Sequence, residues 1–215
     1  MNDLTQRLAA CYTAVVHDIM RAHGFTNFVL PHTIRLLQPD RRLAGPIWTV
    51  EGHPTDQADP EQTLLEWTGL LSRARPGHVI VCQPHTHEIA LMGELSSETL
   101  KLRGIEGYVV DGAARDVART IEQNFPVACT HATPRDIVGR WLPHSVGEAI
   151  HIGDVRIETG DWLIADMDGI CILPMAHAEE IVAAAEEAIG TENKVRTAIL
   201  DGLDPQEAFR LHGKF

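Results

Sequence analysis

Apolar residues recur at helical spacing in the first part of the chain. Over residues 3–23 they return every three or four positions, and Gly24 is suited to follow the last turn of a helix. The positions on this apolar side are Leu4, Leu8, Cys11, Val15 and Ile19. The pattern predicts one amphipathic helix that packs against a core.

The central part of the chain alternates between helical and strand patterns. Residues 78–84 and 105–112 are apolar nearly throughout, which is typical of strands that are buried on both faces. The predicted order is helix 60–77, strand 78–84, helix 93–104, strand 105–112, a short helix at about 115–123, and strand 125–134. Such alternation predicts parallel β-α-β units.

The pattern changes on both sides of this central part. Residues 41–52 read as a strand, although Gly45-Pro46 in its middle argues against a central position in a sheet. Residues 148–174 contain three Gly-Asp or Asp-Gly turn signals between short apolar runs, which predicts an antiparallel meander or a small barrel-like layer. A long helix rich in Ala and Glu is expected over residues 175–200. No linker divides the chain, so residues 1–215 are expected to form one mixed α/β domain.

The net charge of the chain argues against some classes of binding partner. Acidic residues outnumber basic ones by 30 to 18, which gives a formal net charge of −12. Such a field repels nucleic acid and anionic membranes, although a local arginine or metal ion can still hold an anionic substrate. The N-terminal segment carries charges and has no long apolar core, so we expect neither a signal peptide nor a membrane span. Four widely spaced cysteines fit reduced, structural thiols in a cytoplasmic protein.

The candidate chemistry lies in the stretch GELSSETLKLRGIEGYVVDGAARDV, from Gly93 to Val117. Gly93 and Glu94 stand at the start of one predicted helix, and Arg115 and Asp116 follow a predicted strand. Ligands of parallel α/β sheets gather beyond the carboxyl ends of the strands. We therefore expect the Gly-Glu and Arg-Asp steps to face each other across a cleft.

These residue types suit a metal and an organic acid. Arg115 can bind a carboxylate through two hydrogen bonds, and the backbone N–H groups of Leu95 and Ser96 are free at a helix start. Asp116 and Glu94 are oxygen ligands of the kind that Mg2+ and Mn2+ prefer. The alternative is that both carboxylates only complement helix dipoles. Lys101, the lysine near these residues, lies in mid-helix and is a poor candidate for a Schiff base.

Three other features have plainer explanations. His85 and His87 stand beside Glu88 and could hold zinc or iron, but no third ligand at a suitable spacing is evident, and the loop could instead line the substrate pocket. Asp166 and Asp168 fit a tight turn with Asp168-Gly169 at its corner. The glutamates of residues 177–190 fit a solvated helix face.

The Gly93–Asp116 stretch resembles the class II, metal-dependent 4-hydroxy-4-methyl-2-oxoglutarate aldolases, in a family that also contains the regulator of ribonuclease E activity A. These aldolases are described by an acidic residue, twenty intervening residues and then Arg-Asp, and Glu94 followed by Arg115-Asp116 has this spacing. Further resemblance lies in TAVVHDIM (13–20), RLAGPIWTV (42–50), RPGHVIV (75–81), FPV (125–127), TPRDIVGR (133–140) and IGDVRIETGDWLIADMDGICILP (152–174).

The resemblance implies a layered αββα sandwich that assembles as a homotrimer or a homohexamer. Asp116 would bind Mg2+ or Mn2+, and Glu94 would hold a water molecule on that ion. Arg115, with the backbone at Gly93, Leu95 and Ser96, would bind a small-molecule keto acid. The implied reaction is retro-aldol cleavage of a 4-hydroxy-2-oxo acid to pyruvate and a second oxo acid, with decarboxylation of oxaloacetate as a side activity.

Two departures leave the substrate open. Glu94 stands where the aldolases typically have Asp, and the histidine-rich QPHTHE (83–88) is not a family hallmark. A related lyase acting on another keto or hydroxy acid is one alternative. A non-catalytic regulator of a ribonuclease is the other, although such regulators lack the full acidic and Arg-Asp pattern.

Overall fold

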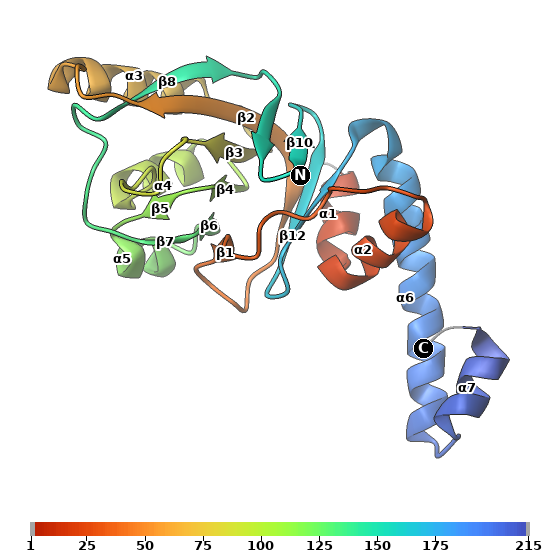
Figure 1. Cartoon of the computed structure of the whole chain (residues 1–215). Coiled ribbons are helices and arrows are strands. Elements are labelled where there is room, and N and C mark those ends of the chain that lie inside the picture. The colour runs from red at the N-terminus through yellow and green to blue at the C-terminus, as the bar shows by residue number, and fades with distance from the viewer. Residues whose placement is uncertain (1–2, 214–215) are drawn as a thin grey trace.

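One mixed β-sheet organises the chain in the computed structural model, which describes residues 3–213 (Figure 1). Its strand order is β1-β6-β4-β3-β2-β11-β12, and β8 pairs with β2 outside this path. The strands are β1 Arg35–Leu36, β2 Leu43–Pro54, β3 Val79–Gln83, β4 Gly107–Val110, β6 Val127–Cys129, β8 Trp141–Val146, β11 Trp162–Ala165 and β12 Ile170–Leu173. The pairs β2/β3, β3/β4 and β4/β6 are parallel, and the others are antiparallel. The fold class is therefore the expected α/β one.

Helices and strands alternate as expected in the centre of the chain. The helices are α3 Pro60–Arg73, α4 Glu94–Leu102 and α5 Val117–Glu122. Asp59 caps α3 through its side chain, which accepts the N–H groups of Glu61 and Gln62, and Pro60 opens the first turn. Gly104 follows α4 with φ +75, a backbone conformation that favours glycine after a helix.

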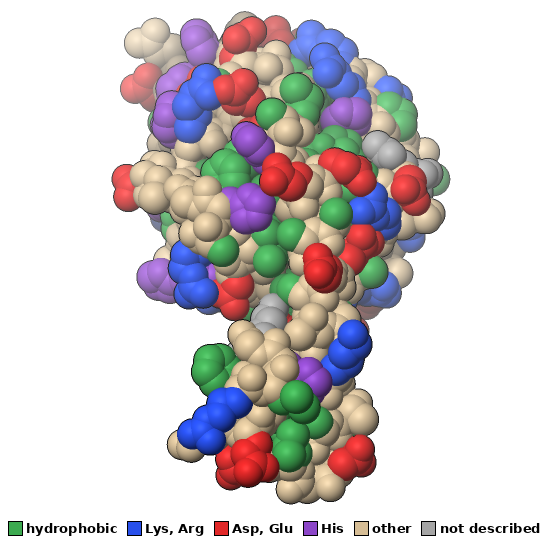
Figure 2. All heavy atoms as spheres, turned by 90° about the vertical axis from the view of Figure 1, so that its right-hand side faces the viewer, with side chains coloured by type: hydrophobic (Ala, Val, Ile, Leu, Met, Phe, Trp, Pro, Cys, Tyr) green, Lys and Arg blue, Asp and Glu red, His purple; other side chains and the backbone are tan. Residues whose placement is uncertain are grey.

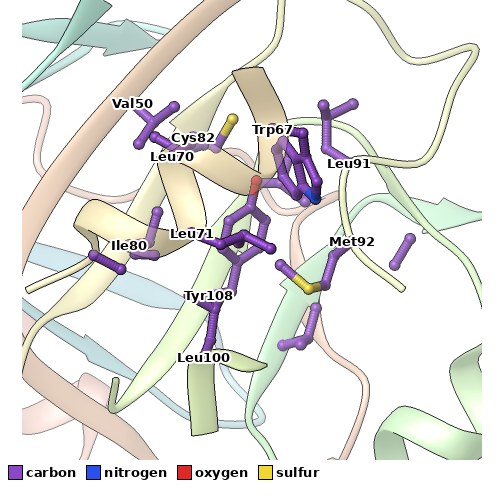
Figure 3. Packing of buried hydrophobic residues seen from close by; sticks show 14 of the residues in the cluster. Val50, Trp67, Leu70, Leu71, Ile80, Cys82, Leu91, Met92, Leu100 and Tyr108 are labelled. Carbon is purple, nitrogen blue, oxygen red and sulfur yellow. The ribbon is translucent and has the colours of Figure 1, made fainter. Parts of the chain in front are cut away.

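Three apolar cores separate four layers. Alternate side chains of β3 and β4, such as Ile80 and Tyr108, pack against α3 and α4 (Figure 3). The intervening ones, such as Val79 and Val109, face the hairpin of β9 (Ile150–Ile152) and β10 (Val155–Ile157) and the inner face of β11 and β12. The outer face of β11 and β12 packs against α1, α2 and α6. This order of layers is the expected αββα sandwich, and it explains why β3 and β4 are apolar on both faces.

The strand β2 lies inside the sheet, so the argument from Gly45-Pro46 against a central position was wrong. Pro46 pairs with Trp162 of β11, and the ladder to β3 begins one residue later, at Ile47. Because β2 changes partners along its length, the missing N–H of Pro46 falls where no hydrogen bond to β3 is due.

The prediction of one helix over residues 3–23 was also wrong, because the chain forms α1 (Asp3–Ala10) and α2 (Thr13–Ala22). The break comes from a distant residue. The Asp166 carboxylate accepts the Thr13 N–H at 2.8 Å and the Thr13 hydroxyl at 2.5 Å, which starts a second helix. Asp166 also closes the predicted turn, since its N–H donates to the Gly169 carbonyl. The Asp166 carboxylate therefore has a structural role, and Asp168 stands in the expected turn, where its N–H donates to Asp166 Oδ1.

The helix α6 (Ala178–Leu200) extends beyond the helices of the body against which it packs. Its second half projects from the body and carries α7 (Pro205–His212), so the two form a separate lobe (Figures 1 and 2). The glutamates of its first half are not simply solvated: Glu179 and Glu186 pair with Arg7 of α1. Within the described residues, no helix is long and apolar enough to cross a membrane. All four cysteines are buried and free.

Candidate active site

A cavity of about 360 Å3 opens between α3 and the start of α4. Its apolar wall comes from α3 and the segment before α4, and its charged side chains are Glu94, Arg115, Asp116 and Asp136. The described apolar lining includes Leu64, Trp67, Leu71, Leu91, Met92, Ile137 and Val138. An apolar pocket with a few converging polar groups is the usual form of a small-molecule site.

Short backbone ladders bring the two predicted steps together. Ala90 forms a parallel bridge with Ala113 of β5 (Ala113–Ala114), and the Leu91 N–H donates to the Ala113 carbonyl at 2.9 Å. Two residues further on, the Arg115 N–H donates to the Met92 carbonyl at 2.8 Å. The segment before α4 therefore runs beside the segment before α5. Gly93-Glu94 and Arg115-Asp116 meet at the end of this pairing, as the sequence predicted.

Gly93 is required by space rather than by its backbone angle. Its φ of −150 is open to any residue, but an added Cβ would stand 2.7 Å from Asp116 Oδ2 and 3.1 Å from Arg115 Cγ. Such contacts are far shorter than ordinary van der Waals distances. The absent side chain therefore allows the Asp116 carboxylate and the Arg115 side chain to lie over the start of α4.

Asp116 occupies a strained backbone position at the start of α5. Its φ is +53 and its ψ is 34, a left-handed conformation that is uncommon for a residue other than glycine. Its Oδ2 atom accepts the Glu94 N–H at 3.2 Å and lies 3.5 Å from Arg115 Nε. The side chain remains 42% exposed, so the carboxylate is accessible to a ligand. Local strain of this kind is often kept at functional sites.

Arg115 bridges two carboxylates on the floor of the site. Its Nε faces Asp116, and its Nη1 lies 3.6 Å from Asp136 Oδ2. Both separations are long for charge-assisted hydrogen bonds, which leaves donors of the half-exposed guanidinium available to an anion. Sequence analysis missed Asp136. The signal available was its place in TPRDIVGR, but only the fold brings this segment to Arg115.

The remaining predicted residues line the first turn of α4. Within the described residues, the N–H groups of Leu95 and Ser96 make no hydrogen bond, and the Leu95 side chain is exposed. The Ser96 hydroxyl accepts from Trp67 Nε1 at 2.9 Å, which fixes the indole in the cavity wall. The Glu94 carboxylate is half-buried in the lining. Lys101 is turned elsewhere and donates to the Gln123 carbonyl.

The donor set fits a small divalent cation. Asp116 and Glu94 offer hard carboxylate oxygens, and the open cavity above Gly93 leaves room for several water ligands. Mg2+ and Mn2+ are bound by such sets, with one or two carboxylates and retained water. Asp116 is the better placed ligand, because one of its oxygens is already held by the Glu94 N–H.

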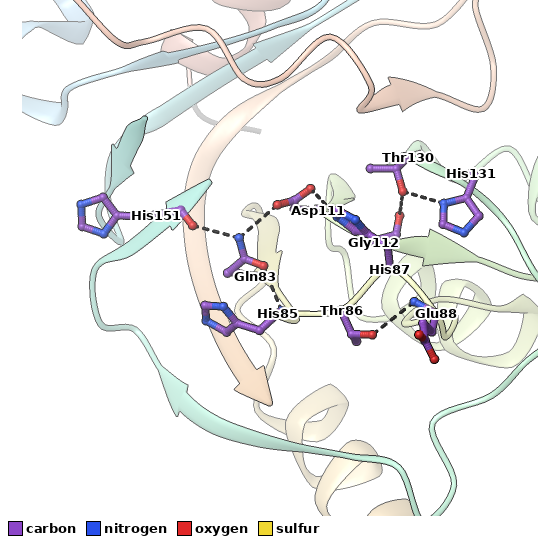
Figure 4. Close-up of polar contacts among 10 residues, drawn as sticks. All are labelled: Gln83, His85, Thr86, His87, Glu88, Asp111, Gly112, Thr130, His131 and His151. Atoms are coloured by element: carbon purple, nitrogen blue, oxygen red, sulfur yellow. Dashed lines mark hydrogen bonds and ion pairs between the residues drawn. The ribbon is translucent and has the colours of Figure 1, made fainter. Parts of the chain in front are cut away.

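The histidine-rich loop does not line this cavity. Along this segment, the first residue that lines the cavity is Ala90. The two histidines contact different partners: His85 Nε2 lies 2.9 Å from Glu51 Oε1, and His87 Nε2 lies 3.1 Å from Asp111 Oδ1. Figure 4 shows them on opposite sides of the loop. The expectation that this loop lines the substrate pocket was therefore wrong.

The chain combines a layered α/β fold with a cavity in which Arg115 meets the carboxylates of Glu94, Asp116 and Asp136. The RraA-like family, described as Aldolase/RraA, matches residues 13–172, and the chain belongs to this family. This confirms the resemblance drawn from the Gly93–Asp116 stretch.

Several known proteins are similar to this chain. "Putative 4-hydroxy-4-methyl-2-oxoglutarate aldolase" of Halalkalibacterium halodurans is 29% identical over 181 residues, which cover 84% of this chain and 81% of that protein. Protein DlpA of Legionella pneumophila is 27% identical over 210 residues, 97% of this chain, but the match spans only 33% of that longer protein. The crystal structure of Streptomyces coelicolor RraAS2, described as an unusual member of the RNase ES inhibitor RraA family, has 25% identity and a TM-score of 0.82. That match covers 92% of this chain and 98% of RraAS2.

Proposed function

We propose that the protein is a divalent-metal-dependent carbon–carbon lyase. It would cleave a 4-hydroxy-2-oxo acid to pyruvate and a second oxo acid, and decarboxylate oxaloacetate as a side activity. The observation that carries this proposal is the meeting of Gly93-Glu94 and Arg115-Asp116 in one cavity. Similarity to proteins named as 4-hydroxy-4-methyl-2-oxoglutarate aldolases supports it.

Each residue would have a distinct part. Arg115 would bind the carboxylate next to the oxo group, and the unpaired N–H groups of Leu95 and Ser96 would donate to the same end of the substrate. Asp116 would hold Mg2+ or Mn2+. When bound, such an ion polarises a carbonyl oxygen and stabilises negative charge that develops on it.

Two proton transfers would accompany the cleavage. Cleavage breaks the C3–C4 bond, its electron pair stays on C3, and the C4 hydroxyl becomes an oxo group as it loses its proton. Glu94 would orient a water molecule that takes this proton, and a second proton transfer to C3 completes pyruvate. Glu94 lines the cavity next to Asp116, which is consistent with an action through a water molecule on the ion.

A non-catalytic binding role is the second candidate function. It is favoured by the close fold similarity to RraAS2, whose description places it in a family of ribonuclease inhibitors. Such a role does not need a cavity in which an arginine and three carboxylates converge. We also propose a homotrimer or homohexamer, in which a neighbouring chain would cover the exposed Leu95 at the rim of the cavity.

The test measures pyruvate released from oxaloacetate and from 4-hydroxy-4-methyl-2-oxoglutarate, with Mg2+, with Mn2+ and with a chelator. Wild type is compared with Asp116→Ala and with Asp168→Ala, which removes an exposed turn carboxylate outside the cavity. We expect metal-dependent turnover that only Asp116→Ala abolishes. Absence of both turnover and Mg2+ or Mn2+ binding in wild type would contradict the proposal and favour the binding protein.

A further inference from the structure

A second group of ligating side chains lies away from the cavity, at the end of β2. Glu51 and His53 are two residues apart on this strand, so their side chains share a face. His85 reaches them from the turn after β3. One ligand atom from each residue lies within 4.8 Å of the other two. None of the three residues lines the active-site cavity.

We propose that Glu51, His53 and His85 form a second metal site, for a transition-metal ion of the Zn2+ type. This site is independent of the proposed lyase activity. Two imidazoles and one carboxylate are a ligand set that suits zinc, and the fourth position is left to water or a further side chain. The predominantly oxygen-based surroundings of Asp116 instead suit Mg2+ or Mn2+.

The fold presets the position of His85. Its backbone has φ +53, and its N–H donates to Gln83 Oε1 at 3.0 Å. The Gln83 amide in turn donates to Asp111 and to the His151 carbonyl (Figure 4). The Trp141 indole donates to the Pro84 carbonyl at 3.0 Å. The turn that carries His85 is therefore fixed from three sides before any metal binds.

His144 is a candidate for the fourth ligand. The register of β2 with β8 shifts at this point: Ser145 pairs with Glu51 and Pro143 with Gly52, so His144 is an extra residue in a β-bulge. A bulge redirects side chains relative to the regular alternation of a strand. The His144 ring lies edge-on to the His53 ring, with centroids 5.4 Å apart.

Metal binding requires a small rearrangement that the site allows. The His53 and His85 rings are stacked, with centroids 4.5 Å apart and an interplanar angle of 6°. An imidazole binds a metal in its own plane, so two parallel rings cannot share one ion, and one ring must tilt. His53 is exposed and, among the described residues, makes no hydrogen bond that would hold it. Ligand atoms around tetrahedral zinc are about 3.3 Å apart, so the present spacing needs only a modest closure.

The charge of the site also favours a cation. Glu51 accepts hydrogen bonds from His85 at 2.9 Å and from Ser145 at 3.3 Å. These contacts hold the carboxylate beside the His85 imidazole, where it can supply the oxygen ligand of the set.

The experiment titrates the folded protein with Co2+, a spectroscopic substitute for Zn2+, and follows the visible absorption of a low-coordinate ion; Zn2+ is then measured by competition. All variants carry Asp116→Asn, so that the active-site cavity does not contribute. We expect one ion per chain, and at least a tenfold weaker affinity in His53→Gln and in His85→Gln. His87→Gln is the matched control, because it removes an exposed histidine of the same loop that pairs with Asp111 instead.

The three variants distinguish a specific metal site from non-specific binding. Loss of binding in His53→Gln and His85→Gln, with binding retained in His87→Gln and circular dichroism unchanged in all three, supports the site. Equal losses in all three variants, unchanged binding in all three, or no binding to the parent protein with metal in large excess would each overturn it. Zn2+ should also raise the Tm of the parent protein but not of His85→Gln, since a ligand that binds only the folded state stabilises it.

Discussion

The Glu94 N–H donates a hydrogen bond of 3.2 Å to Asp116 Oδ2, and these residues are 22 positions apart in the chain. The bond joins the first residue of α4 to the residue that precedes α5. It satisfies one free N–H at a helix start, and the Asp116 side chain, which lines the cavity, remains 42% exposed. The same carboxylate therefore supports the local fold and offers a ligand for a cation.

The Asp116→Asn substitution separates the contribution of this side chain to the local fold from its proposed role as a cation ligand. The amide keeps an oxygen that can accept the Glu94 N–H but loses the negative charge. We expect the fold to remain and metal-dependent pyruvate release to fall by about 100-fold or more, since the charge that holds the cation is lost. Steady-state kinetics with oxaloacetate and Mg2+ would measure this. Wild-type rates in a variant that no longer binds Mg2+ would contradict the assignment.

Gly93→Ala should damage the site without unfolding the protein. The added methyl group would stand 2.7 Å from Asp116 Oδ2, so the carboxylate and the Arg115 side chain must move. Displacements of about 1 Å at a reacting centre can lower rates about 100-fold. The comparison is Gly190→Ala in α6, where an added Cβ meets nothing within 4 Å and catalysis should not change. Equal kcat/KM in both variants would show that the close approach at Gly93 is irrelevant to turnover.

Gly52→Ala should destabilise the fold. A Cβ there would lie 2.0 Å from Trp141 Cζ2 and 2.5 Å from the Leu142 carbonyl oxygen, inside the pairing of β2 with β8. Overpacking of a buried site costs about 1–3 kcal/mol, measured as the free energy of unfolding in urea. Gly69→Ala is the control, because this position in α3 is open and alanine favours a helix. A midpoint for Gly52→Ala at or above that of wild type would refute the prediction.

The Glu51 carboxyl should contribute to stability against acid. Its pKa is lowered from the ordinary 4.5, first by the hydrogen bond from His85. A group with a lowered folded pKa stabilises the fold above its unfolded pKa, and this stabilisation is lost as the pH falls through the folded pKa. The difference in unfolding free energy between wild type and Glu51→Gln should therefore shrink as the pH is lowered below about 4.5. Urea unfolding at several pH values in metal-free buffer checks this, and a difference independent of pH would contradict it.

The sequence by itself predicted the alternating elements of the centre and the approach of Gly93-Glu94 to Arg115-Asp116. Apolar runs at 78–84 and 105–112 predicted strands buried on both faces, which two of the three cores confirm. The position of Gly93-Glu94 at a helix start and of Arg115-Asp116 after a strand predicted that the two dipeptides meet, and Glu94 N lies 3.2 Å from Asp116 Oδ2. Both signals are local: periodicity reports burial, and a short β-α-β unit leaves its chain ends few ways to pair.

Only the tertiary structure decided the features that depend on distant segments. The helical pattern of residues 3–23 is continuous, but Asp166 starts a new helix at Thr13. Asp136 reaches Arg115, and β8 pairs with β2, through contacts that no spacing in the sequence encodes. Likewise, His85 was paired with His87 in the sequence, while in space it joins Glu51 and His53. Side chains from separate strands become neighbours only when the sheet sets their register, so such a cluster has no local pattern.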